Sequence, residues 1–238
     1  MNKPDLSIVV PCYNEAENIP ELITRFARVI DDQPIELVIV NNGSNDLSAE
    51  ILAKYQQQYL FITVVDIKIN QGYGYGIMAG LRQAKADCLG WTHADLQTDP
   101  SDVIKGFHLL QEQKETNRCY IKGDRKGRPL FDQIFTMGMS LFETLYLATR
   151  LWDINAQPNI FHRSFFDKWK SKAPDDFSLD LFVLYQANLE KLNIIRFEVY
   201  FPDRIHGQSS WNTSLLGKWK FIKRTILFST NLKRGLIK

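Results

Sequence analysis

The stretch Ser-Ile-Val-Val-Pro-Cys-Tyr-Asn-Glu at residues 7–15 decides the fold class of this chain. Its first part, Ser7–Pro11, is a short apolar run that ends in proline, which is typical of a strand buried on both faces of a sheet. Asn18 is the predicted cap of a helix over Ile19–Ile30, and Pro20 stands in its first turn, where a missing N–H does no harm. A buried strand followed at once by a helix predicts an α/β fold.

This alternation of strand and helix continues along the first half of the chain. We expect further strands at Glu36–Val40, Ile62–Ile69, Cys88–Thr92 and Cys119–Lys122, and helices at Ser48–Gln58, Gly72–Leu81 and Pro100–Gln113. The pattern predicts a mostly parallel sheet with helices on both faces. After residue 125 the alternation stops, and we expect helices at Leu130–Thr149 and Leu179–Leu189, an irregular segment at Asp153–Pro158 and a strand at Ile194–Phe201.

We therefore predict one domain over residues 1–210, followed by a basic amphipathic tail over residues 211–238. Residues 1–125 would form its first half and residues 126–210 its second. Hydrophobic residues make up 45% of the chain and charged residues 24%, as in ordinary globular proteins. No apolar run approaches the roughly eighteen residues that a membrane span needs.

The net charge and the cysteines indicate the cellular compartment of the chain and the kinds of partner that it binds. Three cysteines at unrelated spacings (Cys12, Cys88 and Cys119) form neither a disulfide set nor a zinc site, so we expect a reducing, cytoplasmic setting. The net charge is +2. Because the first 200 residues carry no marked basic cluster, we do not expect nucleic acid as a partner.

Polar clusters stand at the carboxyl ends of four predicted strands, where open α/β sheets bind their ligands. They are Tyr13-Asn14-Glu15, Asn41–Ser44, Asn70–Gly76 and His93–Gln97. In the first cluster Pro11 closes the strand, and Tyr13 and Glu15 project where a nucleotide base and ribose can be hydrogen-bonded. The alternative is a plain helix N-terminus, with the acid placed there for the helix dipole.

Taken in order, six stretches resemble the family 2 glycosyltransferases, within them the dolichyl-phosphate mannose synthase-like, or polyprenyl-phosphate glycosyltransferase, branch. They are S-I-V-V-P-C-Y-N-E (7–15), V-I-V-N-N-G-S-N-D (38–46), N-Q-G-Y-G-Y-G (70–76), H-A-D-L-Q (93–97), G-D-R (123–125) and F-P-D-R-I-H-G-Q-S (201–209). The resemblance implies a GT-A fold, a nucleoside diphosphate sugar as donor and an inverting transfer. It also implies a divalent metal, Mg²⁺ or Mn²⁺, that holds the donor diphosphate. It further implies that the domain is catalytic, with a nucleotide-sugar half over residues 1–125 followed by an acceptor half over residues 126–210.

The metal would bind at His93–Gln97, where the family carries Asp-x-Asp-x-Gln. Asp95 and Gln97 match that pattern, whereas His93 replaces the first carboxylate. Imidazole suits Mn²⁺ less well than it suits zinc or iron. Three alternatives follow: the site uses Asp95 and Gln97 alone, it includes His93 as a ligand, or it binds another metal. The structural alternatives are a histidine bonded to the backbone and an aspartate that caps the next helix.

The donor side departs from the family at two further places. Asn41 and Asn42 replace an Asp-Asp pair that reads the base, and the amide of Asn42 can still pair with a base edge because it offers a donor and an acceptor. A plain turn is the alternative. Gly72 opens the loop that the family packs beside the donor, and Tyr73 replaces its usual lysine.

Three more residues take roles that the resemblance implies. Arg125 lies where the family places an arginine near an acceptor phosphate, with Lys122, Lys126 and Arg128 around it. Asp180 stands where an acid could deprotonate an acceptor hydroxyl, but a phosphate acceptor needs no base and would leave it structural. Arg204 is the candidate that offsets the charge of the leaving diphosphate.

The tail carries seven Lys or Arg residues after Arg204 and no acid. A predicted helix over Leu215–Leu227 places Leu215, Trp219, Ile222 and Ile226 on one stripe, which predicts peripheral binding at the inner face of the plasma membrane. The alternative is a helix packed on its own domain.

A polyprenyl phosphate is the leading acceptor, and a saccharide hydroxyl in surface polysaccharide or glycolipid assembly is the alternative. Two other functions stay open. Gly74–Ala79 matches the G-x-G-x-x-A dinucleotide fingerprint, so a nicotinamide-dependent oxidoreductase is a rival. The replacements at Asn41, Asn42 and His93 also leave open a nucleotide-binding module without catalysis.

Overall fold

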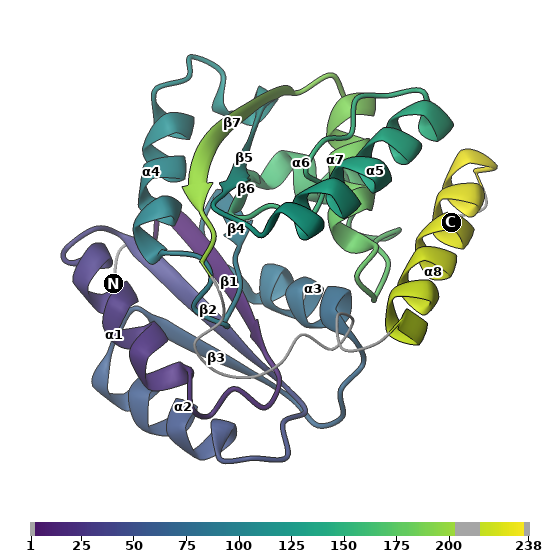
Figure 1. Cartoon of the computed structure of the whole chain (residues 1–238). Coiled ribbons are helices and arrows are strands. Elements are labelled where there is room, and N and C mark those ends of the chain that lie inside the picture. Colours follow the sequence, from purple (N-terminus) through teal and green to yellow (C-terminus); the bar gives the residue numbers. More distant parts are fainter. Residues whose placement is uncertain (1–2, 203–214, 236–238) are drawn as a thin grey trace.

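A single seven-stranded sheet forms the centre of the molecule (Figure 1), which we describe from a computed structural model over residues 3–202 and 215–235. The strand order is β3-β2-β1-β4-β6-β5-β7. The strands are β1 (Leu6–Cys12), β2 (Ile35–Asn42), β3 (Ile62–Ile67), β4 (Cys88–Trp91), β5 (Cys119–Lys126), β6 (Asn159–His162) and β7 (Asn193–Tyr200). All neighbours run parallel except β6, which is antiparallel to β4 and β5. The expected mostly parallel α/β sheet is confirmed.

Helices cover both faces of the sheet. One face packs against α1 (Ile19–Ile30), α2 (Ser48–Gln58) and α4 (Pro100–Gln111). The other face packs against α3 (Tyr73–Gln83), α6 (Arg163–Trp169) and α7 (Leu179–Leu189), through a core rich in aromatic rings. The central strands β1 and β2 are buried almost throughout, as their apolar sequences predict.

Two elements of the second half were not predicted, the strand β6 and the helix α6. β6 is only four residues long and has two apolar residues, so its sequence carries no usable period. Its register places Asn159 opposite Trp91 of β4 on one side and Lys122 of β5 on the other. An asparagine therefore occupies the middle of the sheet, beneath the carboxyl end of β4.

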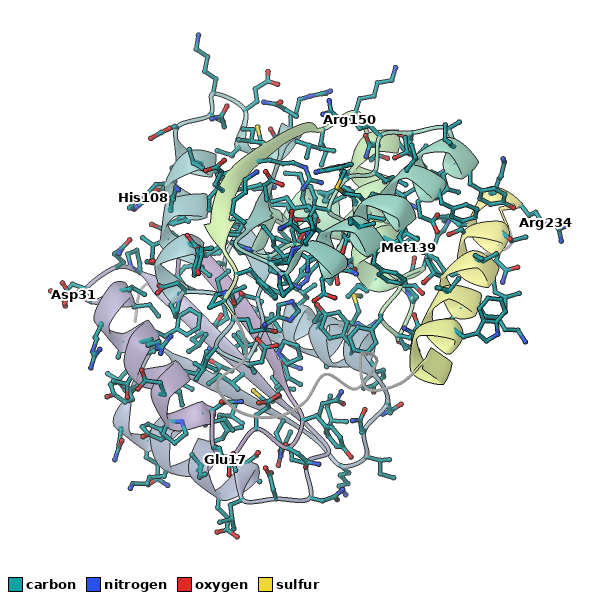
Figure 2. The ribbon with its side chains drawn as sticks, in the orientation of Figure 1. Glu17, Asp31, His108, Met139, Arg150 and Arg234 are labelled. Carbon is teal, nitrogen blue, oxygen red and sulfur yellow. The ribbon has the colours of Figure 1, made fainter. Side chains whose placement is uncertain are left out.

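Two long helices, α5 (Leu130–Leu147) and α8 (Leu215–Lys233), lie side by side at the outside of the second half (Figure 1). Figure 2 marks them with Met139 on α5 and Arg234 just beyond the end of α8. Ser229 Oγ donates to Glu143 Oε2 over 2.7 Å, and Lys233 Nζ donates to the carbonyl of Tyr146 over 2.7 Å. The described part of the expected tail is therefore a helix that packs on the domain, six residues longer than predicted.

No helix within residues 3–202 and 215–235, the part of the chain that the structure describes, has both the length and the apolar character needed to cross a bilayer.

Candidate donor and metal site

The four polar clusters meet at one edge of the sheet, because β1 to β4 run parallel and end on the same side. Hydrogen bonds join the loops that follow β1 and β2. Asn14 N–H donates to Ser44 Oγ over 3.0 Å, Asn45 N–H donates to Asn14 Oδ1 over 2.8 Å, and Glu15 N–H donates to Ser48 Oγ over 3.1 Å. These contacts give the edge a fixed backbone on which side chains can be presented.

Tyr13 stands out on this edge because its side chain is 44% exposed beside the closing residue of β1. An exposed ring of this kind can stack on a nucleotide base. Pro11 and Glu15 are both half-buried, and Glu15 Oε2 accepts a hydrogen bond from Asn18 Nδ2. The structure thus places the first predicted cluster together at the edge of the sheet, at the start of α1.

The two asparagines at the end of β2 differ in how their amides are used. Asn41 Nδ2 donates to Asp66 Oδ1 over 2.7 Å, and Asn41 Oδ1 accepts from Ser44 N–H over 3.2 Å. Asn42 Nδ2 donates to the carbonyl of Gly72 over 2.8 Å, while its Oδ1 has no partner among the described residues. Asn42 is therefore the member of the pair with an unused acceptor, and because this oxygen is buried, its amide would have to turn outward to meet a base edge.

The candidate metal motif His93–Gln97 follows β4 in a bend. Asp95 is buried, with 4% of its surface exposed, and its Oδ1 accepts from Gln97 N–H over 3.2 Å. Gln97 Nε2 donates to the carbonyl of Pro202 over 2.9 Å, and this fixes the orientation of the amide. The ring centroid of His93 lies 6.2 Å from that of Tyr73.

These side chains fit a divalent metal that takes few ligands from the protein and the rest from phosphate and water. Within the described residues, no group of three or more His, Cys, Asp or Glu side chains gathers around a common point. Among the described residues, this excludes a structural zinc site, in which four protein side chains surround the metal. One carboxylate and one amide oxygen suit Mg²⁺ or Mn²⁺, which bind through few protein groups together with phosphate and water.

Arg125, the predicted acceptor contact, lies on β5 and is paired with Asp153. Arg125 N–H donates to Asp153 Oδ2 over 2.9 Å, and its Nε donates to Oδ1 over 3.0 Å. Burial acts to raise the pKa of Asp153, but the charge and hydrogen bonds of Arg125 outweigh it and hold that pKa below its ordinary value. Arg125 is thus fixed in place by a buried partner, and Arg204 lies outside the described residues.

Asp180 lies in the first turn of α7, in the interior of the molecule. Its Oδ1 accepts from Trp91 Nε1 over 3.3 Å and from Asn159 Nδ2 over 3.2 Å. Asn159 Oδ1 in turn accepts from Lys122 Nζ over 2.7 Å and from Tyr120 over 2.6 Å. These side chains form one buried network beneath the edge of the sheet.

Lys122 is the residue of this network whose burial the sequence did not predict. It was expected at the end of the strand Cys119–Lys122, among the cations around Arg125, yet it is 0% exposed, and burial lowers its pKa to about 7. Its position inside the apolar strand Cys-Tyr-Ile-Lys was the available signal, because residues in a strand covered on both faces are all buried.

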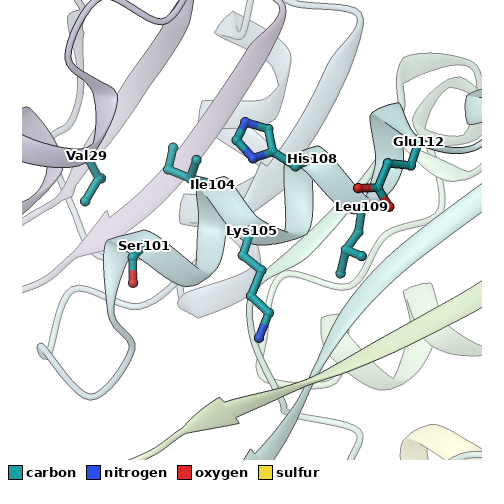
Figure 3. A pocket seen from close by; sticks show the side chains of 7 residues that line it. All are labelled: Val29, Ser101, Ile104, Lys105, His108, Leu109 and Glu112. Atoms are coloured by element: carbon teal, nitrogen blue, oxygen red, sulfur yellow. The ribbon is translucent and has the colours of Figure 1, made fainter.

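A shallow groove on the outer side of α4 is a concave feature away from the sheet edge (Figure 3). It is lined by Val29, Ser101, Ile104, Lys105, His108, Leu109 and Glu112. None of the predicted site residues borders it, and its charged groups are exposed, so it does not compete with the sheet edge as the functional site.

The sequence profile of Glycosyl transferase family 2 matches residues 7–169. An undecaprenyl-phosphate 4-deoxy-4-formamido-L-arabinose transferase of Edwardsiella ictaluri is 37% identical over 242 residues, which cover 96% of this chain and 69% of that protein. The chain belongs to glycosyl transferase family 2. The protein of the same name in Yersinia enterocolitica is 39% identical over 110 residues, and this match covers 45% of the chain but only 34% of that relative.

Solved structures confirm the GT-A fold of this glycosyltransferase. Glucosyl-3-phosphoglycerate synthase from Mycobacterium tuberculosis, in complex with Mn²⁺, UDP and glucosyl-3-phosphoglycerate, has a TM-score of 0.71 and 16% identity, covering 98% of this chain and 81% of that one. A mannosyltransferase from Pyrobaculum calidifontis, in complex with GDP-Man and Mn²⁺, has a TM-score of 0.64 and 16% identity, covering 88% and 59%. At such identities the likeness concerns the fold.

The glycine fingerprint of this glycosyltransferase has a packing explanation. Gly72 adopts φ 109°, and a Cβ there would lie 2.5 Å from the carbonyl oxygen of Asp175. A Cβ on Gly74 would lie 2.4 Å from the carbonyl oxygen of Pro174, and one on Gly76 would lie 3.1 Å from Asn42 Nδ2. These glycines let the start of α3 approach the loop before α7 and the end of β2, so they carry no sign of a dinucleotide site.

Proposed function

We propose that this glycosyltransferase moves a sugar from a nucleoside diphosphate sugar to a polyprenyl phosphate, with inversion at the anomeric carbon. The observation that carries the proposal is the meeting of Tyr13, Asn42 and the His93–Gln97 motif at one sheet edge, with Pro202 bonded to Gln97. The names of the relatives, which are undecaprenyl-phosphate sugar transferases, support the acceptor class.

In this proposal Tyr13, Glu15 and Asn42 hold the nucleoside, with Pro11 and Gly72 shaping the surface beneath it. Asp95 and Gln97 hold a divalent ion, with His93 beside them. The ion, when bound, offsets the negative charge that grows on the diphosphate as it leaves. Arg204 follows Pro202 by two residues and adds positive charge to the same leaving group.

The acceptor phosphate lies toward Arg125, and one of its oxygens attacks the anomeric carbon from the side opposite the leaving diphosphate. A new carbon–oxygen bond forms as the bond to the diphosphate breaks. A phosphate is already ionised, so no group has to remove a proton. This agrees with Asp180, which is buried and accepts two hydrogen bonds from the protein.

An apolar face supports contact with a membrane surface. We use the name α5–α8 face for the exposed apolar side chains of these two packed helices, which are Leu130, Ile134, Met137, Leu141 and Leu145 on the side of α5 away from Glu143 and its contact with α8, and Trp219, Ile226 and Leu227 on α8. Those on α5 recur at spacings of three and four residues and so form one stripe. Their exposed fractions run from 49% to 73%, which is unusual for a continuous row on a monomer.

Exposed cationic side chains on α8 suit an anionic leaflet. Lys223, Lys233 and Arg234 are exposed on or just beyond α8, and each cation near such a leaflet contributes about 1 kcal/mol. We therefore extend the expected basic tail to a two-helix surface, and propose peripheral binding at the inner face of the plasma membrane.

The test is an assay with separate donors and acceptors. The purified chain is incubated with UDP-, GDP- and dTDP-sugars, with and without Mn²⁺, in the presence of undecaprenyl phosphate, of oligosaccharides, or of neither. Nucleoside diphosphate release that needs undecaprenyl phosphate and yields a sugar-linked lipid supports the proposal. A saccharide product, or nucleotide binding with no turnover under any condition, would overturn it.

A further inference from the structure

The loop between α6 and α7 connects α8 to the candidate metal motif. It lies against the start of α3 on one side and against α8 on the other (Figure 1). Tyr75 N–H donates to the carbonyl of Asp175 over 2.9 Å, and the close approach of Gly72 and Gly74 to this loop leaves no space between the two backbones.

Three aromatic rings continue this connection into the site. Phe177 stacks on Tyr73, with ring centroids 4.7 Å apart and planes 8° from parallel. The ring of Tyr73 in turn lies 6.2 Å from that of His93. The hydroxyl of Tyr73 is 2.7 Å from the side-chain amide of Gln157, so Tyr73 is held by its hydroxyl as well as by the face of its ring.

On the far side, α8 braces the same loop through Arg224. Its guanidinium lies over the ring of Phe177, 5.4 Å from the centroid, and its Nε is 3.6 Å from Asp176 Oδ2. Asp176 also accepts from Ser178 N–H over 2.8 Å, just before α7 begins. A helix that follows the last strand of the sheet therefore contacts the same loop as the glycine segment of α3.

We infer that Phe177, braced by Arg224 of α8, is a positioning residue for the metal motif and acts through the ring of Tyr73. Stacked planar rings restrain one another in tilt and distance, and a cation above the outer ring adds to that restraint. Loss of the stack removes the support of Phe177 from the face of the Tyr73 ring while its hydroxyl stays bonded, so the ring can tilt relative to His93 and the motif is less well ordered before a ligand arrives. This inference rests on the proposed function, because the metal site is itself a proposal.

The experiment measures binding rather than turnover. UDP and GDP are each titrated into the full chain with Mn²⁺ in a calorimeter, without lipid. Phe177→Leu keeps the apolar volume but removes the planar ring, and Arg224→Ala removes the brace. We expect each to weaken Mn²⁺-dependent nucleotide affinity by about three- to tenfold, the range of one lost ring contact. Phe177→Tyr keeps the stack and should match the unmodified chain.

Arg234→Ala is the matched control, since it makes the same change just beyond the end of α8, away from the loop. It should leave the affinity unchanged. A second readout uses no metal: amide hydrogen exchange at residues 72–76 and 93–97 should speed up in Phe177→Leu and Arg224→Ala, and stay unchanged in Arg234→Ala.

The outcomes separate the two proposals. If the unmodified chain binds neither nucleotide with Mn²⁺, the proposed function is wrong. If it binds one of them and Phe177→Leu and Arg224→Ala bind it equally well with unchanged exchange, the function stands and the positioning role is refuted.

Discussion

The donor edge and the α5–α8 region distribute polarity in opposite ways. At the donor edge, polar side chains gather around the ends of β1 to β4, of which β1 and β2 are buried and apolar, and the loops after these two strands are tied by hydrogen bonds such as that from Asn14 N–H to Ser44 Oγ. In the α5–α8 region, the ionisable side chain of Glu143 is fully buried, while leucines such as Leu141 lie outside.

This difference indicates what each region contacts. Polar groups at an open sheet edge suit a charged, water-soluble ligand that enters from solvent. An exposed apolar stripe costs solubility and is retained where something apolar covers it. The buried ionisable groups near this region are hydrogen-bonded: Lys122 to Asn159, Glu143 to Ser229, and Arg125 to its counter-charge Asp153, which holds the short strands and helices around them in one arrangement.

The largest expected effect concerns the donor edge. Asp95→Asn removes the one carboxylate of the metal motif and should lower sugar transfer by at least about a hundredfold, the scale of losing one group that stabilises transition-state charge. Transfer is measured at saturating Mn²⁺, with circular dichroism as a check of folding. Asp99→Asn is the control, because Asp99 caps α4 by accepting from Ser101 N–H and asparagine caps equally well. Substantial transfer by a folded Asp95→Asn chain would contradict the metal assignment.

The accuracy with which the sequence predicts the structure also differs between the two halves of the chain. In the first half, strand and helix bounds were predicted to within a few residues, as for α1 over Ile19–Ile30, because each apolar run is followed by turn-forming residues, although the predicted cap Asn18 makes no side-chain hydrogen bond to the helix N-terminus. In the second half β6 and α6 were missed, and the burial of Lys122, at the end of a predicted strand of the first half, was missed as well. Its burial depends on Asn159, which is 37 residues away along the chain, and local patterns do not report such contacts.

The next prediction tests whether a buried charge in the second half is structural. Asp153→Asn leaves Arg125 largely buried without its counter-charge, and should lower the free energy of unfolding by about 3–5 kcal/mol. Denaturant unfolding at pH 7 measures this loss. The pKa of Asp153 is lowered in the folded state, so its contribution is present above the ordinary value of 3.8 and is lost as pH falls below it. Equal stability of the two chains at pH 7 would mean that the pair contributes nothing.

The third prediction compares exposed leucines from the two regions. Leu141→Glu places a charge in the α5–α8 face and should weaken binding to anionic vesicles by about tenfold, since the lost apolar burial and the added repulsion act together. Leu60→Glu is the control, because Leu60 is 78% exposed but follows α2 in the donor half. Co-sedimentation with vesicles at two salt concentrations measures both. Equal loss in the two variants would show that the face has no special role.

The smallest expected effect concerns Glu143, between α5 and α8. Burial raises its pKa to about 7 from 4.5, although the hydrogen bond from Ser229 acts to lower it. A raised pKa means that its contribution is fully present below about pH 4.5 and is lost as pH rises through 7. Glu143→Gln keeps a neutral hydrogen-bonding group, so the unmodified chain should lose a few degrees of melting temperature relative to this variant between pH 5 and pH 8.

Only the difference between the two melting curves is informative, because Lys122 titrates over the same range with the opposite sign. Burial lowers the pKa of Lys122 from 10.5 to about 7, so its effect is to make the folded state more stable as pH rises. Both chains carry Lys122, and subtraction removes its contribution. If the difference between the curves does not change with pH, Glu143 is not neutral in the folded protein, and α8 is held on α5 by its apolar contacts and by Lys233 instead.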